Sequence, residues 1–208
     1  GRRFESCHPY HIMNKLFGVP IFKSVITFPD EERKKLTDYI LKIEDYCEAP
    51  NDWLCDLKTS FKVNSKLHLL NNFQFISTML NSYAEQYAKD INFDYYNYTI
   101  YMSRMWFNVY RKNHSQEKHD HGRSFLSSTF MLQIPKGASN FVFYNPLHEG
   151  LISYPVIEDN ELIMSNIESK QNKLLIFPGW LEHGVKLNNT EEPRITISAN
   201  WQIQPRGG

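Results

Sequence analysis

Apolar positions recur every three or four residues over two stretches in the first half of the chain, about 31–48 and 66–89. This spacing places the apolar side chains on one face of an amphipathic helix, so both stretches are predicted to be helical. Asp30 is expected to act as the N-cap of the first helix, because its carboxylate can accept a hydrogen bond from a free backbone N–H group. The apolar stripes are expected to pack against a sheet. They consist of Leu36, Tyr39, Ile40, Ile43 and Cys47 in the first helix and Leu69, Phe73, Ile76, Leu80, Tyr83 and Tyr87 in the second.

Short strands are predicted before the helices and throughout the second half of the chain. Residues 16–28 are rich in β-branched and aromatic residues, which favours an extended segment. After Asp90 the pattern becomes partly alternating and is interrupted by proline, glycine and asparagine, whereas residues 147–170 are polar and suggest a hairpin or an insertion. Short strands punctuated in this way predict an antiparallel sandwich or barrel. The predicted strands of the second half lie within residues 96–112, 124–135, 140–146, 172–180 and 194–203.

The order of these elements predicts an α+β fold that is mainly β. The chain of 208 residues suits one domain, in which about 16–90 forms a helical buttress and about 91–203 forms the β core. Neither an internal repeat nor a low-complexity linker divides the sequence.

Composition narrows the class of protein. Hydrophobic residues make up 41% of the chain and charged residues 22%, which is enough apolar material for a packed core. With 23 basic and 23 acidic residues the net charge is zero, so no nucleic-acid surface is evident. An apolar run of the ~20 residues that a membrane span needs is absent from the sequence. The three cysteines form no CxxC pair, which argues against a disulfide framework and favours a reduced, cytoplasmic compartment.

The sequence "HDH" at residues 119–121 raises the question of a metal site. In an extended segment alternate side chains share a face, so His119 and His121 would point the same way and Asp120 the other way. Two imidazoles at this spacing can bind one ion, but the motif alone is a weak signal because surface loops often contain it. A third histidine, His183, follows a turn at Pro178 and Gly179 and is a candidate for the remaining ligand.

A candidate site for a carboxylate follows His183. Arg194 opens a predicted strand, and Thr196 and Ser198 lie on the same face of that strand. A guanidinium group binds a carboxylate through two parallel, charge-assisted hydrogen bonds, and a hydroxyl group can add a third.

The order and spacing of five motifs resemble the iron(II)- and 2-oxoglutarate-dependent oxygenases, and among these the group found in bacteria and phages. The last two motifs are the most specific. The early segment "LFGVPIF" is similar to the N-terminal segment of proteins in the same group, so the resemblance covers about residues 16–203. It implies a double-stranded β-helix (a jelly roll, like that of the cupins) with N-terminal helices packed on one sheet. It also implies that the protein is a dioxygenase that uses Fe(II) and 2-oxoglutarate, and that it hydroxylates its substrate. The five motifs are "WFN" (106–108), "HDH" (119–121), "SFLSS" (124–128), "FPGWLEH" (177–183) and "RITIS" (194–198).

This sequence departs from the family's usual metal ligands, which are His-x-Asp/Glu and a distant histidine. His121 stands where the family has the acid. Three ligand sets are therefore open: His119, His121 and His183; two histidines and water; or a set completed by Glu117 or Asp120. We favour the three histidines, because strand alternation places His119 and His121 on one face and requires no bulge.

The resemblance also implies the roles of the polar residues. Arg194, with Thr196 or Ser198, would bind the far carboxylate of 2-oxoglutarate, and Asn108 would make a polar contact inside the barrel. The substrate is expected to be a small molecule or a peptide, selected by the loops at 111–118 and 147–170.

Two other functions stay open at this point. Three-histidine barrels include metal dioxygenases that do not use 2-oxoglutarate. The absence of the usual acid is also compatible with a non-catalytic jelly-roll binding module.

Overall fold

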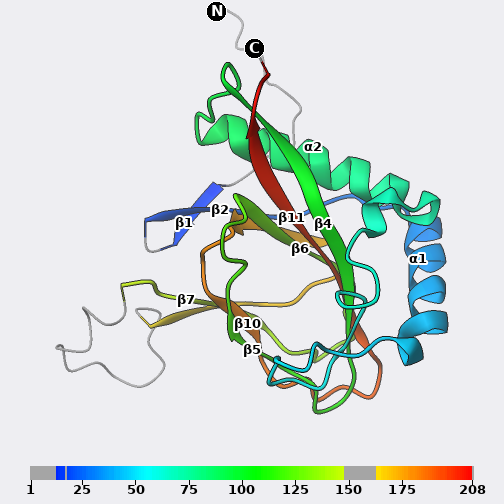
Figure 1. Cartoon of the computed structure of the whole chain (residues 1–208). Coiled ribbons are helices and arrows are strands. Elements are labelled where there is room, and N and C mark those ends of the chain that lie inside the picture. The colour runs from blue at the N-terminus through cyan, green and yellow to red at the C-terminus, as the bar shows by residue number, and fades with distance from the viewer. Residues whose placement is uncertain (1–12, 17, 148–162, 208) are drawn as a thin grey trace, which may run out of the picture.

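The computed structural model describes residues 13–16, 18–147 and 163–207, and its strands form two antiparallel sheets. Figure 1 shows the two helices on the outer side of the larger sheet and the smaller sheet at the other end of the molecule. The larger sheet has the strand order β1 (Met13–Leu16), β2 (Val19–Val25), β9 (Lys173–Pro178), β6 (Leu126–Gln133), β11 (Arg194–Pro205), β4 (Tyr98–Tyr110) and β3 (Lys58–Thr59). The smaller sheet has the order β5 (Gln116–His119), β10 (His183–Val185), β7 (Phe141–Tyr144) and β8 (Met164–Ile167).

Two α-helices and three 3-10 turns complete the described part of the chain. They are α1 (Asp30–Ile43), η1 (Glu44–Tyr46), η2 (Leu67–Leu69), η3 (Asn71–Phe73) and α2 (Gln74–Asp90). The described helices are all too short or too polar to cross a membrane.

Strand alternation divides the core into two layers. On β11, Ile197 and Trp201 belong to the cluster that includes Leu36 of α1 and Leu80 of α2. The opposite face of the larger sheet contributes Met131, Phe177 and their neighbours to a second cluster, which also contains Phe141 and Phe143 of the smaller sheet. The larger sheet therefore lies between the helices and the smaller sheet, and each of its faces is covered.

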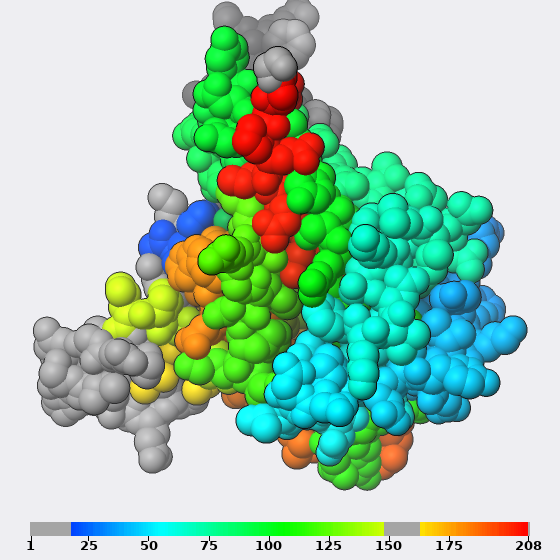
Figure 2. Space-filling view, viewed as in Figure 1, coloured from blue at the N-terminus to red at the C-terminus, as the bar shows by residue number. Residues whose placement is uncertain are grey.

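β11 and β4 form the longest pairing and extend beyond the rest of the sheet. β11 pairs with β4 along its whole length, but with β6 only as far as Trp201. In Figure 2 the ends of these two strands, red and green, project together from the body of the molecule. The first half of β11, from Arg194 to Asn200, is buried, and this half carries Arg194, Thr196 and Ser198.

The mainly β architecture with helices packed on one sheet is as the sequence predicted, but several local predictions were wrong. The N-cap of α1 is Pro29 rather than Asp30, and the Asp30 carboxylate instead pairs with Arg33 one turn later. Residues 67–73 form two 3-10 turns, so the second helix begins at Gln74.

Strands β3, β5 and β10 were not predicted, because each has only two to four residues and shows no period of its own. β5 occupies part of the segment 111–118 that was expected to be a loop. Most of the predicted insertion at 147–170 lies outside the described residues, and its last part contains β8.

The position of Ile197 between the sheet and the helices makes a test of this packing. Ile197 is fully buried on a strand that pairs on both sides. We expect Ile197→Ala to lower the free energy of unfolding by about 2–5 kcal/mol, because it removes buried methyl groups and leaves a cavity. Ile197→Val should cost only about 0.5–1.5 kcal/mol. Urea unfolding followed by circular dichroism measures both values, and equal costs for the two variants would contradict the packing.

Candidate metal centre

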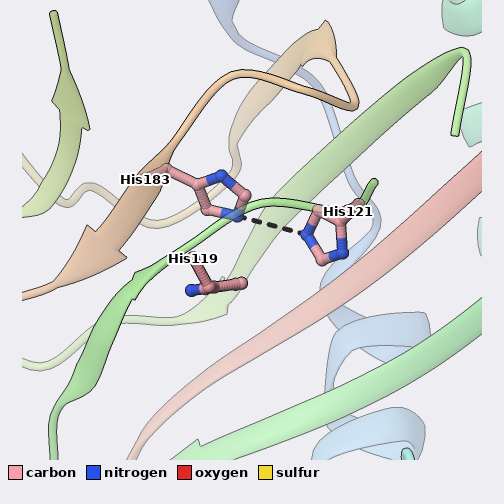
Figure 3. Close-up of side chains that lie close together, drawn as sticks. All are labelled: His119, His121 and His183. Atoms are coloured by element: carbon pink, nitrogen blue, oxygen red, sulfur yellow. Dashed lines mark hydrogen bonds between the residues drawn. The ribbon is translucent and has the colours of Figure 1, made fainter. Parts of the chain in front are cut away.

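Three histidines from two distant segments converge at one end of the smaller sheet. His119 ends β5 and His183 begins β10, and these two residues are direct partners in the strand register. His121 lies in the turn that follows β5, where its backbone N–H donates to the carbonyl oxygen of Gly179 at 2.8 Å. One nitrogen from each imidazole lies within 4.8 Å of the other two. Figure 3 shows the three rings around a common point.

The structure brings the three predicted histidines together, but strand alternation is not what orients His121. The strand ends at His119, so alternation does not orient His121. The turn and its hydrogen bond to Gly179 do so instead. A Cβ atom at Gly179 would lie 2.2 Å from the carbonyl oxygen of Ser124, so only glycine allows the two segments to approach this closely.

Hydrogen bonds orient two of the rings with Nε2 toward the common point. Nδ1 of His119 lies 2.8 Å from the carbonyl oxygen of Glu117, and Nδ1 of His183 lies 2.8 Å from that of Leu181. A carbonyl oxygen only accepts, so each Nδ1 carries the proton and donates it, which leaves Nε2 with a free lone pair. This is the usual arrangement of a histidine that ligates a metal through Nε2.

The closest nitrogen pair fits two ligands of one ion. Nε2 of His121 and Nε2 of His183 are 3.2 Å apart. Two lone pairs at this distance repel each other unless a proton or a cation lies between them. Two nitrogens that are each about 2.1 Å from one ion are themselves separated by roughly 3.0–3.4 Å, depending on the coordination angle.

Aromatic rings pack against all three imidazoles. Trp53 stacks on His119 with ring centroids 6.4 Å apart, and Trp106 lies 5.5 Å from the ring of His121. Phe141 is nearly parallel to His183 at 5.4 Å. Because burial disfavours the charged imidazolium, it lowers the pKa of all three histidines, and that of His121 falls to about 3. All three side chains are therefore neutral near pH 7, the form that binds metals.

The two nearby acids are engaged elsewhere. A carboxylate oxygen of Glu117 accepts the backbone N–H of Leu54 at 3.0 Å, and one of Asp120 accepts that of Gly122 at 2.6 Å. In the part of the chain that the structure describes, the cluster of metal-binding side chains contains the three histidines and no acid.

Arg194 is a buried cation with unused hydrogen-bond donors. Its side chain is completely buried, with the guanidinium 4.8 Å from the ring centroid of Tyr110. Nη2 donates to the hydroxyl of Ser169 at 3.4 Å, whereas Nε and Nη1 have no partner among the described residues. Burial lowers the pKa of this guanidinium, because the charged form loses its hydration. A buried cation of this kind requires an anion to offset the cost of desolvation.

The polar residues predicted beside Arg194 lie on the inner face of the larger sheet. Thr196 and Ser198 are buried and share this face with Arg194, and Thr196 is the register partner of Asn108. Nδ2 of Asn108 donates to Ser198 at 3.4 Å, while Oδ1 of Asn108 has no partner among the described residues. The sheet therefore brings all four predicted residues to one layer of the interior.

Two cavities meet at the histidines. The inner one, about 20 Å³, extends from His183 to Asn108, Tyr110 and Ser198. It has room for little more than one water molecule, so a five-carbon dicarboxylate requires side chains to move. The outer cavity, about 590 Å³, opens to solvent and shares Trp53, Gln116, His119 and His121 with the inner one.

The walls of the outer cavity were mostly missed by the sequence argument. Trp53 and Phe61 come from the segment between η1 and η2, which shows no periodic pattern, and Arg104 resembles any polar residue of an alternating strand. Gln116 to Lys118 lie in the predicted selectivity segment and do line the cavity. Of the other predicted selectivity segment, residues 148–162 lie outside the described residues.

Comparison with protein families gives one match. Residues 104–200 match the family model described as "Putative 2OG-Fe(II) oxygenase". The matched segment extends from β4 to β11 and contains His119, His121, His183 and Arg194. A search of curated protein sequences gave no significant match.

Solved structures with a similar fold are numerous, and three illustrate the range. The alpha-ketoglutarate-dependent epimerase SnoN from nogalamycin biosynthesis superposes with a TM-score of 0.61 at 11% identity, covering 90% of this chain and 79% of that one. A Pseudomonas putida prolyl-4-hydroxylase gives 0.57 at 12% identity, with 93% and 96% coverage. The viral collagen prolyl hydroxylase of Paramecium Bursaria Chlorella virus-1, in a 2OG complex, gives 0.58 at 11% identity, with 87% and 94% coverage. At these identities the similarity shows the fold, and it confirms the predicted double-stranded β-helix.

The lowered pKa values predict how the stability of the metal-free protein depends on pH. Below the ordinary histidine value of 6.5, the unfolded chain binds protons that the folded cluster does not bind, down to about pH 3 for His121. The free energy of unfolding should therefore decrease as the pH falls from 6.5 toward 4. Urea unfolding at several pH values measures this slope, which should be shallower in His121→Gln. His114→Gln, outside the cluster, serves as the control, and an unchanged slope in His121→Gln would refute the assignment.

Proposed function

We propose that the protein is an Fe(II)- and 2-oxoglutarate-dependent hydroxylase with His119, His121 and His183 as its metal ligands. The match of residues 104–200 to the 2OG-Fe(II) oxygenase family model supports this proposal. The observation that carries the proposal is the pairing of two features in one interior layer. One is a cluster of three imidazoles with nitrogens within 4.8 Å, and the other is a buried arginine with two donor atoms unpaired among the described residues.

The donor set suits the proposed metal. Imidazole nitrogen is a good ligand for iron, nickel, copper and zinc, and three such ligands leave coordination positions open for a cosubstrate and oxygen. The positions of Glu117 and Asp120, each bound to a backbone N–H group, favour His121 over either acid as the third ligand. Three neutral ligands leave the full charge of the ion in place, and an anionic cosubstrate offsets it.

Arg194 is suited to bind the distal carboxylate of 2-oxoglutarate. Nε and Nη1 can form the two parallel hydrogen bonds that a carboxylate accepts, and the ring of Tyr110 holds the guanidinium in place. Ser198 and Asn108, which line the inner cavity between Tyr110 and the histidines, supply further polar contacts, and Thr196 lies beside them on β11. The unpaired donors of Arg194 favour this function over a metal dioxygenase that uses no 2-oxoglutarate.

Each part of the site has a separate task in the reaction. Bound Fe(II) and 2-oxoglutarate together supply the oxidising power that inserts an oxygen atom from O₂ into a C–H bond. Trp53, Trp106 and Phe141 pack against the three imidazoles and hold them in place. The outer cavity of about 590 Å³ gives the substrate access to the metal from the solvent side.

The first test is metal and cosubstrate binding without oxygen. Anaerobic addition of Fe(II) and 2-oxoglutarate should produce a weak visible charge-transfer band. His183→Ala should abolish the band, whereas His114→Ala should keep it. Absence of the band in the wild-type protein, together with no succinate formed with any substrate tried, would refute the proposal.

The role of His121 is tested by Ni(II) affinity, measured by calorimetry in the absence of 2-oxoglutarate. His121→Ala should weaken binding at least tenfold if His121 is a ligand, because one of three metal–nitrogen bonds is lost. An affinity equal to that of the wild-type protein would instead support two histidines and water. His121→Asp, which restores the family's usual acid, should retain binding.

The role of Arg194 is tested by separating cosubstrate binding from metal binding. Arg194→Gln should lower the affinity for 2-oxoglutarate about tenfold or more, since a hydrogen bond to a charged group contributes roughly 1.5–3 kcal/mol. The affinity for Ni(II) alone should not change. If the affinity for 2-oxoglutarate is unchanged in this variant, the alternative of a metal dioxygenase that does not use 2-oxoglutarate is favoured.

A further inference from the structure

Two arginines line the outer cavity and have no counterion in the described part of the chain. Arg104 lies on β4 and Arg123 in the turn after His121, and both side chains are exposed to the cavity. Neither side chain forms a hydrogen bond or an ion pair with another described residue, although the backbone of Arg104 pairs with Asn200. The third basic residue of the lining, Lys118, differs because it pairs with Glu182 at 3.1 Å.

Arg104 is positioned by its surroundings. Strand alternation places it on the same face of β4 as Trp106 and Asn108, so it points toward the side of the sheet that carries the site. Its guanidinium lies over the ring of Phe61, 5.2 Å from the centroid, and Phe61 in turn contacts Trp106 at 5.2 Å. This stacking holds the cation beside the metal centre and leaves its edge free for hydrogen bonds.

The lining of the outer cavity contains three acidic and three basic residues, and they differ in their partners. Glu117 and Asp120 flank His119 along the chain, and Asp52 precedes the Trp53 that stacks on the same histidine. The charge of Arg104 adds to the effect of burial in lowering the pKa of His121, so Arg104 lies close to that histidine, and Arg123 follows it by two residues. Glu117 and Asp120 each accept a backbone N–H group and Lys118 pairs with Glu182, whereas the side chains of Arg104 and Arg123 have no such partner among the described residues.

We infer that Arg104, assisted by Arg123, is a specificity-determining residue that binds an anionic oxygen group of the substrate, a carboxylate or a phosphate, beside His121 in the outer cavity. Phe61 and Trp53 provide apolar surface for the part of the substrate that carries this group. The inference rests on the proposed function in taking the outer cavity as the substrate's entrance. The anion site itself depends only on the cavity and its arginines.

The test compares ligands that differ in charge and little in shape. Calorimetry or ligand-observed NMR, with the full-length protein, should show benzoate and phenyl phosphate binding more tightly than neutral benzamide. Arg104→Gln should weaken both anions about fivefold, the upper end of the contribution of a partly exposed charge pair, and should leave benzamide unchanged. Lys118→Gln is the matched control: it removes a paired cation from the same lining and should not affect any of the three ligands.

Arg194 offers a second anion site, so Arg194→Gln is measured in parallel. If benzoate and phenyl phosphate lose affinity in Arg194→Gln but not in Arg104→Gln, the inference is overturned. An equal affinity for benzamide and benzoate in the wild-type protein would also overturn it. If Fe(II) and 2-oxoglutarate fail to bind while Arg104→Gln still loses the anions, the proposed function fails and the anion site stands.

Discussion

The alternation of strand β11 is the constraint on which the rest of the structure depends. β11 pairs with β4 on one side and with β6 on the other, so its register determines which of its faces is inside. One face carries Ile197 and Trp201 to the helices, and the other carries Arg194 and Ser198 to the interior between the sheets. A shift by one residue would exchange these two sets, burying the arginine against the helices. The hydrophobic contacts that stabilise the fold therefore also hold Arg194 in place.

The histidine cluster depends on a different contact, the pairing of two short strands. His119 and His183 are opposite each other because β5 pairs with β10, and close-packed glycines permit this approach. A Cβ at Gly184 would meet the carbonyl oxygen of Gln116 at 2.9 Å, just as one at Gly179 would meet Ser124. The rings are then enclosed by aromatic side chains, which keep them neutral and ready to bind a cation.

Charge connects the parts of the site. A divalent ion held by three neutral imidazoles keeps its whole charge, and the buried guanidinium of Arg194 adds another positive charge in the same layer. Among the described residues no carboxylate joins the histidine cluster or pairs with Arg194, so anions from solvent would complete both sites. The outer cavity adds two exposed cations, Arg104 and Arg123, whose side chains have no anionic partner among the described residues. An anionic cosubstrate and an anionic substrate would both be attracted to such a site.

The sequence by itself determined the long elements and the identity of the candidate residues. Segments such as 98–110 and 194–205 alternate over enough positions to define a strand and its two faces, and the spacing of the histidines and Arg194 follows a recognisable family pattern. Only the tertiary structure decided how His121 turns inward after β5 ends and where Glu117 and Asp120 place their carboxylates. It also decided that Trp53, Phe61 and Arg104 line the outer cavity. The physical reason is the range of the interactions. Alternation is a local property of a strand and is visible in its residues. Strands of two to four residues, turns and cavity walls are defined by contacts between distant segments, which leave no periodic pattern in any one of them.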